Sequence, residues 1–304
     1  MGGGSWSASS WSTHVTRTRL DSATKGTDVF KSSKAKKEFL PMNVTRESCD
    51  SVEHPSSTPI ILCLDVTGSM SHILTVMAKK LGMVMEEIYK RNPVSDPQVL
   101  FAGVGDSVYD ESPLQVTQFE SDIRIAEQMN EIWFERGGGG NRFESYPLIW
   151  YFANYHTKCD NYLKRNKKGF IFSFGDDGYP SKLTKSEIKE IFGDDLQGDI
   201  DVKELLSAVN KQYEVYHFCM AQGGSHRDED YHNWQEILGE HAILVRDYDK
   251  IPEMIVSLLE AHAGKETTEI IDSWDGSTAV AVKEMLNNIT AFNGSAESSE
   301  LVEF

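Results

Sequence analysis

The chain has 304 residues, 39% of them hydrophobic and 25% charged, and a formal net charge of −17. This length and apolar content suffice for one core of about two hundred residues with extensions. The negative charge argues against nucleic-acid binding through the domain, because contact with phosphates needs clustered positive charge. No stretch approaches the roughly eighteen apolar residues of a membrane helix, and the N-terminus lacks the apolar core of a signal peptide, so no membrane partner is expected.

Residues 1–57 form a basic N-terminal segment that we interpret as a flexible arm. Residues 1–46 hold eight Lys or Arg against three Asp or Glu, with many Ser and Thr. Its apolar residues, among them Trp6, Trp11 and Phe30, follow no clear period, which favours partial disorder. The same aromatic side chains would be suitable anchors if the arm docked on a partner or a neighbouring subunit.

Beyond this arm, apolar runs alternate with helical patterns. Strands are predicted at residues 59–64, 98–104, 114–119, 169–174, 214–220 and 242–245. Helices are predicted at residues 70–91, 122–135, 145–164, 184–192, 201–211, 232–239 and 251–263. The alternation predicts an α/β fold with a doubly wound, mostly parallel sheet and helices on both faces, over a domain at 58–264. Because the link between the second and third strands is too short for a helical crossover, we expect one of them to be an antiparallel edge strand.

The first predicted strand ends in a group of oxygen-bearing side chains. Its apolar residues stop at Asp65, and Thr67 and Ser69 follow at alternate positions. Ligands of open α/β sheets bind at the carboxyl ends of the strands. One carboxylate and two hydroxyls from a tight turn would form part of an octahedral Mg²⁺ site and leave a position open. The alternative is a helix N-cap without an ion, since Ser and Thr are good caps.

Two later segments and this loop, taken together, resemble three segments of the von Willebrand factor type A (VWA) family. Asp65–Met70 resembles its metal-ion-dependent adhesion site (MIDAS). Residues 138–145, Gly-Gly-Gly-Asn-Arg-Phe-Glu-Ser, resemble its glycine-rich second metal loop, and residues 170–176, Phe-Ile-Phe-Ser-Phe-Gly-Asp, resemble the strand that carries its third metal aspartate. Residues 234–260 resemble the last helices and short strand of the family, in its intracellular prokaryotic or viral type.

The resemblance implies a set of metal ligands. They are Asp65, Thr67, Ser69, Asn141 and Asp176, with Mg²⁺, or Mn²⁺ or Ca²⁺, as the cofactor. Relatives usually have Asp or Thr at the position of Asn141, so this side chain would act through water or its amide oxygen.

Three further acidic residues are expected behind the metal ligands or in contact with a partner, namely Asp106, Glu144 and Asp177. Each has a simpler alternative. Asp106 would cap a turn, Glu144 would make a helix-capping contact, and Asp177 would belong to an ordinary Asp-Asp-Gly turn.

The resemblance implies an intracellular protein-binding module rather than an enzyme. A partner's Asp or Glu would bind at the open position of the metal, within a multiprotein assembly or with an AAA-type ATPase. Two alternatives remain: a structural component of a larger particle held by its terminal arms, and a metal-dependent hydrolase that uses Asp65 and Asp176. The glycine-rich run is not a P-loop, because Lys and Ser or Thr do not follow it, and the histidines lack zinc-type spacing.

The cysteines and the C-terminus complete the sequence-based predictions. The cysteines are few, and Cys63 and Cys219 lie in predicted buried strands, which favours reduced thiols and a cytoplasmic location. Residues 265–304 form an acidic extension with a short helix, since residues 266–304 hold one Lys against eight Asp or Glu. Its end would be a docking peptide or a frayed tail.

Overall fold

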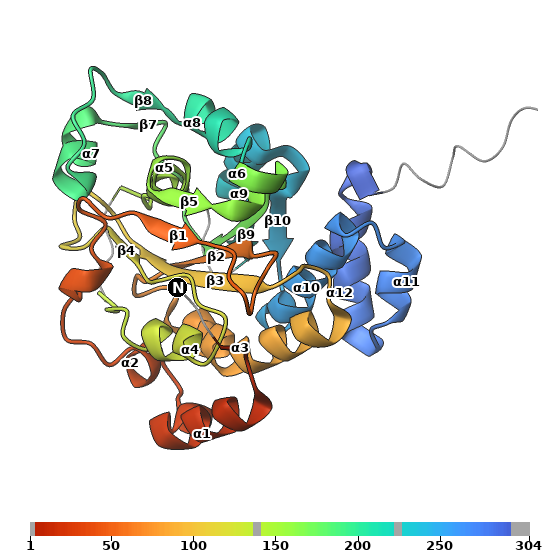
Figure 1. The fold of residues 1–304 in the computed structure, drawn as a ribbon. Coiled ribbons are helices and arrows are strands. Elements are labelled where there is room, and N and C mark those ends of the chain that lie inside the picture. The colour runs from red at the N-terminus through yellow and green to blue at the C-terminus, as the bar shows by residue number, and fades with distance from the viewer. Residues whose placement is uncertain (1–3, 136–140, 222–226, 293–304) are drawn as a thin grey trace, which may run out of the picture.

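A six-stranded sheet forms the centre of the computed structural model, which describes residues 4–135, 141–221 and 227–292 (Figure 1). The strand order is β10-β9-β6-β2-β3-β4. The strands are β2 (Thr58–Asp65), β3 (Pro97–Val104), β4 (Leu114–Val116), β6 (Gly169–Gly175), β9 (Tyr213–Met220) and β10 (Ala242–Val245). Neighbours are parallel except β3 and β4, which are antiparallel at one edge. The predicted fold class is confirmed, including its antiparallel edge strand.

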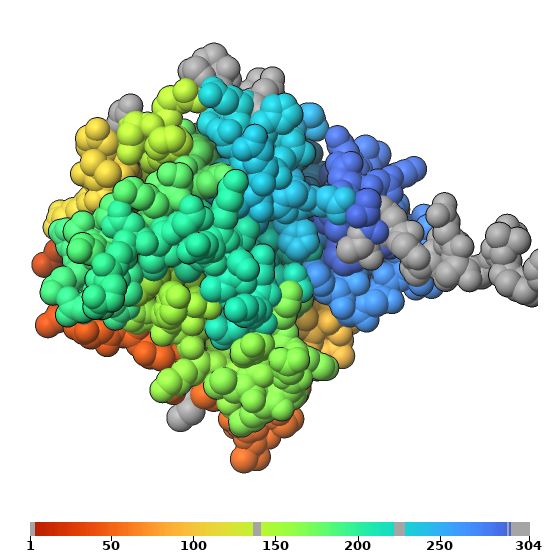
Figure 2. All heavy atoms as spheres, turned by 90° about the horizontal axis from the view of Figure 1, so that it is seen from above, coloured from red at the N-terminus to blue at the C-terminus, as the bar shows by residue number. Residues whose placement is uncertain are grey.

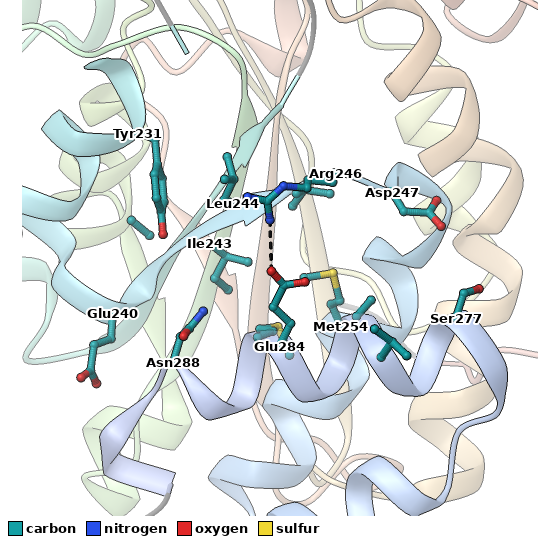
Figure 3. Close-up of a pocket in the computed structure, with 15 residues that line it drawn as sticks. Tyr231, Glu240, Ile243, Leu244, Arg246, Asp247, Met254, Ser277, Glu284 and Asn288 are labelled. Atoms are coloured by element: carbon teal, nitrogen blue, oxygen red, sulfur yellow. Dashed lines mark hydrogen bonds and ion pairs between the residues drawn. The ribbon is translucent and has the colours of Figure 1, made fainter. Parts of the chain in front are cut away.

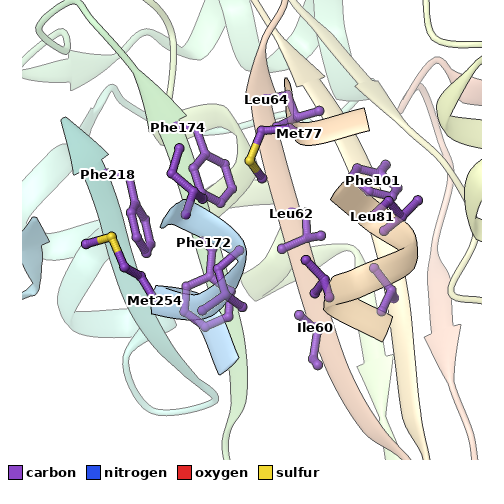
Figure 4. Packing of buried hydrophobic residues seen from close by; sticks show 14 of the residues in the cluster. Ile60, Leu62, Leu64, Met77, Leu81, Phe101, Phe172, Phe174, Phe218 and Met254 are labelled. Atoms are coloured by element: carbon purple, nitrogen blue, oxygen red, sulfur yellow. The ribbon is translucent and has the colours of Figure 1, made fainter. Parts of the chain in front are cut away.

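Helices cover both faces of this sheet because its strands are apolar on both sides. Along β2, Ile60, Leu62 and Leu64 belong to one hydrophobic cluster, whereas Ile61 and Cys63 belong to the other. Figure 4 shows the first cluster, in which Leu64 lies near Met77 and Phe101 lies near Leu81. A strand buried on both faces is expected at the centre of a mostly parallel sheet.

The first cluster is covered by α3 (Ser71–Arg91), α4 (Arg124–Met129), α10 (Ile251–His262) and α12 (Gly276–Asn287). The second is covered by α5 (Pro147–Tyr155), α7 (Lys185–Phe192), α8 (Val202–Val209) and α9 (Arg227–Leu238). A small pair, β7 (Lys182–Leu183) and β8 (Ile200–Asp201), lies between β6 and α8 in the chain.

One predicted helix, 145–164, is wrong in its extent. The structure divides this stretch into α5, the short strand β5 (Thr157–Cys159) and α6 (Asp160–Arg165). Strand β5 pairs in parallel with β1 (Arg46–Ser48), far earlier in the chain. Local periodicity carries no information about such a distant partner, and the partner decides the conformation. The helix predicted at 122–135 is also shorter, because α4 ends at Met129.

The described part of the N-terminal segment packs against the domain, whereas the sequence indicated a flexible arm. It contains α1 (Ala8–Thr18) and α2 (Gly26–Val29). Trp6, Leu20 and Phe30 are buried in the first hydrophobic cluster. Trp11 lies on α3 at Gly82, where an added Cβ would be 2.1 Å from its indole nitrogen. These anchors are irregularly spaced because they come from turns and short helices, so no period announces their burial.

The C-terminal extension is helical up to residue 292 and lies beside α10. It contains α11 (Thr267–Asp272) and α12, which gather at one end of the molecule (blue in Figures 1 and 2). The Arg91 guanidinium joins it to α3, since it lies 3.8 Å from the Trp274 ring centroid and donates to the Ser273 hydroxyl at 2.7 Å. The expected docking peptide beyond residue 292 lies outside the described residues. All four cysteines are free, and no helix in the described ranges is long and apolar enough to cross a membrane.

Candidate metal centre

The polar loop after β2 is held together by hydrogen bonds to Asp65. This aspartate is fully buried, and its Oδ1 accepts from the Thr67 backbone N–H at 2.8 Å and from the Thr67 hydroxyl at 2.6 Å. The Thr67 Oγ1 lies 3.4 Å from Ser69 Oγ. The alternation of short polar residues therefore places one carboxylate and two hydroxyls in one cluster, as the sequence predicted.

Asp176 joins this cluster from the adjacent strand. It follows β6, which pairs with β2 in parallel, so the carboxyl ends of the two strands lie side by side. The Ser69 hydroxyl donates to Asp176 Oδ1 at 3.0 Å. Four of the five predicted ligands are thus linked in a continuous chain of contacts, although Asp65 and Asp176 are far apart in the sequence.

The hydroxyls of Thr67 and Ser69 do not cap the helix that follows. The N-cap residue of α3 is Met70, and no side chain accepts a capping hydrogen bond there. Both hydroxyls instead belong to the series of contacts that connects Asp65 with Asp176. The arrangement favours a role for them in the cluster over the alternative of a helix cap without an ion.

Tyr146 is a member of the site that the sequence analysis missed. Its hydroxyl donates to Asp65 Oδ2 at 2.8 Å, and the residue is fully buried. Gly175 provides the space, because a Cβ there would lie 1.7 Å from the Tyr146 hydroxyl oxygen. In the sequence, Tyr146 precedes the apolar run of α5 and looks like an ordinary core residue. Its position directly after Glu144-Ser145, in a predicted metal loop, was the available signal.

Asn141 is the predicted ligand that the structure does not link to the others. Its Oδ1 accepts from the Phe143 N–H at 3.4 Å, and no hydrogen bond connects it to the other four predicted ligands in the described ranges. The adjacent backbone does reach the site, because Phe143 and Gly178 form a parallel bridge and the Glu144 N–H donates to Gly178 C=O at 3.1 Å. The glycines at 138–140 lie outside the described residues.

Glu144 is the side chain of this second loop that points into the acidic cluster. Only 2% of its surface is exposed, and its Oε2 has no hydrogen-bond partner among the residues that the structure describes. Burial raises the pKa of Glu144 well above its usual range, and the nearby Asp65 and Asp110 carboxylates raise it further. It makes no helix-capping contact, because the N-cap residue of α5 is Tyr146 and no side chain caps it. A buried, unpaired carboxylate oxygen is costly unless a cation or donor compensates it.

Asp106 and Asp177 lie on either side of the cluster. Asp106 Oδ1 accepts from the Val108 N–H at 2.8 Å, the turn-capping contact given above as its alternative. Within the described part of the chain, its buried Oδ2 has no hydrogen-bond partner. Asp177 is half-buried; burial raises its pKa, and Arg142 lowers it. Asp106 follows β3 and Asp177 follows β6, so both belong to the edge of the sheet that carries Asp65.

The residues present fit a hard divalent cation. Carboxylate and hydroxyl oxygens are the ligands that Mg²⁺, Mn²⁺ and Ca²⁺ prefer. Burial raises the pKa of Asp65, and the nearby Asp176 carboxylate raises it further, so the charged form of Asp65 needs a compensating positive charge. No group of three or more His, Cys, Asp or Glu side chains in the described ranges is arranged to hold a metal ion. A metal site at this cluster would therefore need the hydroxyl oxygens of Thr67 and Ser69 as ligands in addition to the carboxylates.

Comparisons with known proteins give distant structural similarity only. No family model matches the chain, and no curated protein matches it. Among solved structures, the pilus adhesin SpaC from Lactobacillus rhamnosus GG, in its open conformation, matches 75% of this chain at 12% identity with a TM-score of 0.46. Proximal thread matrix protein 1 from the mussel byssus matches 68% at 11% identity with a TM-score of 0.42. The chain spans 31% and 46% of the lengths of these two proteins, respectively. Similarity at this level leaves the function to be argued from the site.

Proposed function

We propose that this chain is a VWA-type protein-binding module that holds a divalent cation, Mg²⁺ in the first place, at the carboxyl ends of β2 and β6. The observation that carries the proposal is the chain of contacts from Asp65 through Thr67 and Ser69 to Asp176. These residues would hold the ion, together with Glu144 or Asn141 from the second loop. When bound, the cation supplies an open position that accepts a carboxylate oxygen.

The partner would be a protein that presents an acidic side chain. The site itself is rich in carboxylates and the whole chain has a net charge of −17, so an acidic partner group would be repelled without the cation. Binding of the partner's acidic side chain should therefore require the metal ion. An AAA-type ATPase or the subunits of an assembly are the partners that the family resemblance implies. Free cysteines agree with the cytoplasmic location that we propose.

A calorimetric titration with Mg²⁺ and Mn²⁺ tests the first half of the proposal. Thr67→Val removes one oxygen from the cluster and preserves the shape of the side chain. Thr75→Val is a matched control, because Thr75 lies on α3 and its hydroxyl donates to the Ser71 carbonyl, away from the cluster. We expect the Thr67 variant to lose metal binding by at least about tenfold and the Thr75 variant to keep it. Equal affinity in the two variants would contradict the assignment.

Recovery of the protein from lysate of its native host tests the second half. The protein, its Thr67→Val variant and its Thr75→Val variant are each recovered in Mg²⁺ and in chelator, and co-purifying proteins are identified by mass spectrometry. We expect a partner that appears with the parent and the Thr75 variant in Mg²⁺ alone. A partner retained in chelator would instead favour a structural role through the terminal segments.

A further inference from the structure

The outer edge of β10 lines a groove on the side of the molecule and pairs with no further strand in the described ranges. Figure 3 shows this groove between α9 and α12, with β10 running through it. Its volume is about 430 Å³, and every residue of β10, from Ala242 to Val245, lines it. Strand β10 is the last strand of its sheet in the order found for the described residues, with β9 as its one neighbour.

The backbone of β10 offers hydrogen-bonding groups to this groove. The Val245 carbonyl accepts from the Ala221 N–H at 2.9 Å, so Val245 turns its peptide groups toward β9. Successive residues of a strand turn these groups to opposite edges. Leu244 therefore directs its N–H and C=O into the groove. An open edge of this kind is a template for a further strand.

The walls of the groove are apolar where the side chains of an added strand would lie. Val280 on α12 is 65% exposed, an unusual exposure for an aliphatic residue on a packed helix. Met254 and Met285 line the groove from α10 and α12, and Leu244, which is half-buried, lines it from β10 on the opposite face of the sheet. Methionine side chains adapt to the shapes of different apolar partners.

The charged side chains around the groove favour an occupant with positive charge. Its charged side chains are Glu240, Arg246, Asp247 and Glu284, which leaves an excess of negative charge. Arg246 is already paired with Glu284 at 3.1 Å, the dashed contact in Figure 3. Residues 293–304 of the chain itself contain three Glu and no Lys or Arg, so the tail has the same sign as the groove. Charge complementarity thus favours a basic segment from another protein.

We propose that this groove binds an extended partner peptide with alternating apolar and basic residues, which adds to β10 as a further strand. Main-chain hydrogen bonds to Leu244 would supply affinity, and the apolar walls and acidic rim would supply specificity. The site needs no cation, so it is a second interaction surface, separate from the metal-dependent one.

Fluorescence anisotropy with synthetic peptides tests this proposal on the full-length protein. The probe is a labelled, amidated peptide of about eight residues in which Val and Lys alternate, long enough to span β10. One control has alternating Val and Glu. The second control has the Val–Lys sequence with N-methyl groups along one edge, which keep the charge and block strand pairing. Each titration is run in Mg²⁺ and in chelator.

Variants at the groove locate the binding. Leu244→Pro removes the outward N–H at an edge position, where proline is tolerated. Val280→Lys leaves the strand intact and places bulk and positive charge on the exposed wall, so it remains informative if the proline variant does not fold. Val52→Lys is the matched control, because Val52 is fully exposed and is not part of the groove.

We expect the Val–Lys peptide to bind equally with and without chelator. The two control peptides and the Leu244 and Val280 variants should each bind at least about tenfold more weakly, and the Val52 variant should bind like the parent. Equal binding of the N-methylated peptide, no effect of Val280→Lys, or loss of binding in chelator would overturn the proposal. A tenfold gain in a Leu301→Ser, Phe304→Ser variant would also overturn it, because the chain's own tail would then be the occupant.

Discussion

The Tyr146 hydroxyl donates a hydrogen bond to Asp65 Oδ2 over 2.8 Å, and neither residue is exposed to solvent. This contact joins the start of α5 to the end of β2. It occupies one carboxylate oxygen of Asp65 and leaves Oδ1 facing the hydroxyl of Thr67. A buried tyrosine thus orients the aspartate on which the proposed site depends.

The substitution Tyr146→Phe should lower the free energy of unfolding in chelator by about 1–3 kcal/mol, because it leaves a buried carboxylate oxygen unpaired. Urea unfolding followed by circular dichroism measures this loss. Tyr151→Phe is the control on the same helix; its hydroxyl donates to Asp194, whose side chain is 34% exposed. We expect Tyr151→Phe to lower the free energy of unfolding by less than Tyr146→Phe does. A larger loss in the control would mean that Tyr146 does not orient Asp65 as described.

The substitution Glu144→Gln should raise stability in chelator at neutral pH, by roughly 1–3 kcal/mol. The folded-state pKa of Glu144 lies above its unfolded value, so the unfolded state loses the proton first and the side chain destabilises the fold as pH rises. Gln removes that penalty. Added Mg²⁺ should reduce the difference in stability between the variant and the parent, because only the parent has a Glu144 carboxylate whose charge the cation can compensate.

Thermal unfolding with and without Mg²⁺ measures the effect of Glu144→Gln. Glu86→Gln, at an exposed position on α3, is the control and should change little in either condition. If the Glu144 variant were less stable than the parent in chelator, the carboxylate would have a compensating partner other than a metal.

Acid should weaken the fold partly through His217. This side chain is fully buried against Trp234, and burial lowers its pKa to about 3. Between pH 6.5 and that value the unfolded state binds the proton and the folded state does not. Stability should therefore fall with decreasing pH by about 1.4 kcal/mol per pH unit for this group alone, and it should be unaffected by His217 above pH 7.

Denaturant unfolding between pH 7 and pH 4 measures this slope. His217→Gln should make the slope shallower, whereas the exposed His232→Gln should leave it unchanged. His262 is half-buried, and its pKa is lowered to about 4, so the variant will retain part of the dependence. An unchanged slope in the His217 variant would show that the histidine protonates without unfolding.

The substitution Gly82→Ala should loosen the N-terminal segment. Alanine favours a helix by about 1 kcal/mol over glycine, but its Cβ would collide with the Trp11 ring. We expect α1 to become sensitive to limited proteolysis. Trp11→Ala in the same chain should remove the collision, so that the two changes are not additive. Gly198→Ala, where nothing lies within 4 Å of the added atom, is the control.

The strands and most of the candidate site could be predicted because they depend on local patterns. The run before Asp65 is buried on both faces, so it is apolar throughout, and the polar residues begin where the strand ends. The contribution of Tyr146 could not be predicted, because a phenol in an apolar run looks the same whether it is a core residue or a donor to a carboxylate. Strand β5 was missed because its conformation depends on pairing with β1, more than a hundred residues earlier.

The place of β2 in the sheet has a consequence for synthesis of the chain. Strand β2 lies between β3, which follows it closely, and β6, which begins only at Gly169. A nascent chain can pair β2 with β3 early, but the other edge of an almost wholly apolar strand stays open while the next hundred residues are made. Such an edge is prone to pair with other chains. Fragments that end before β6 should therefore aggregate, and slow translation up to that point would lengthen the period in which the full chain needs a chaperone.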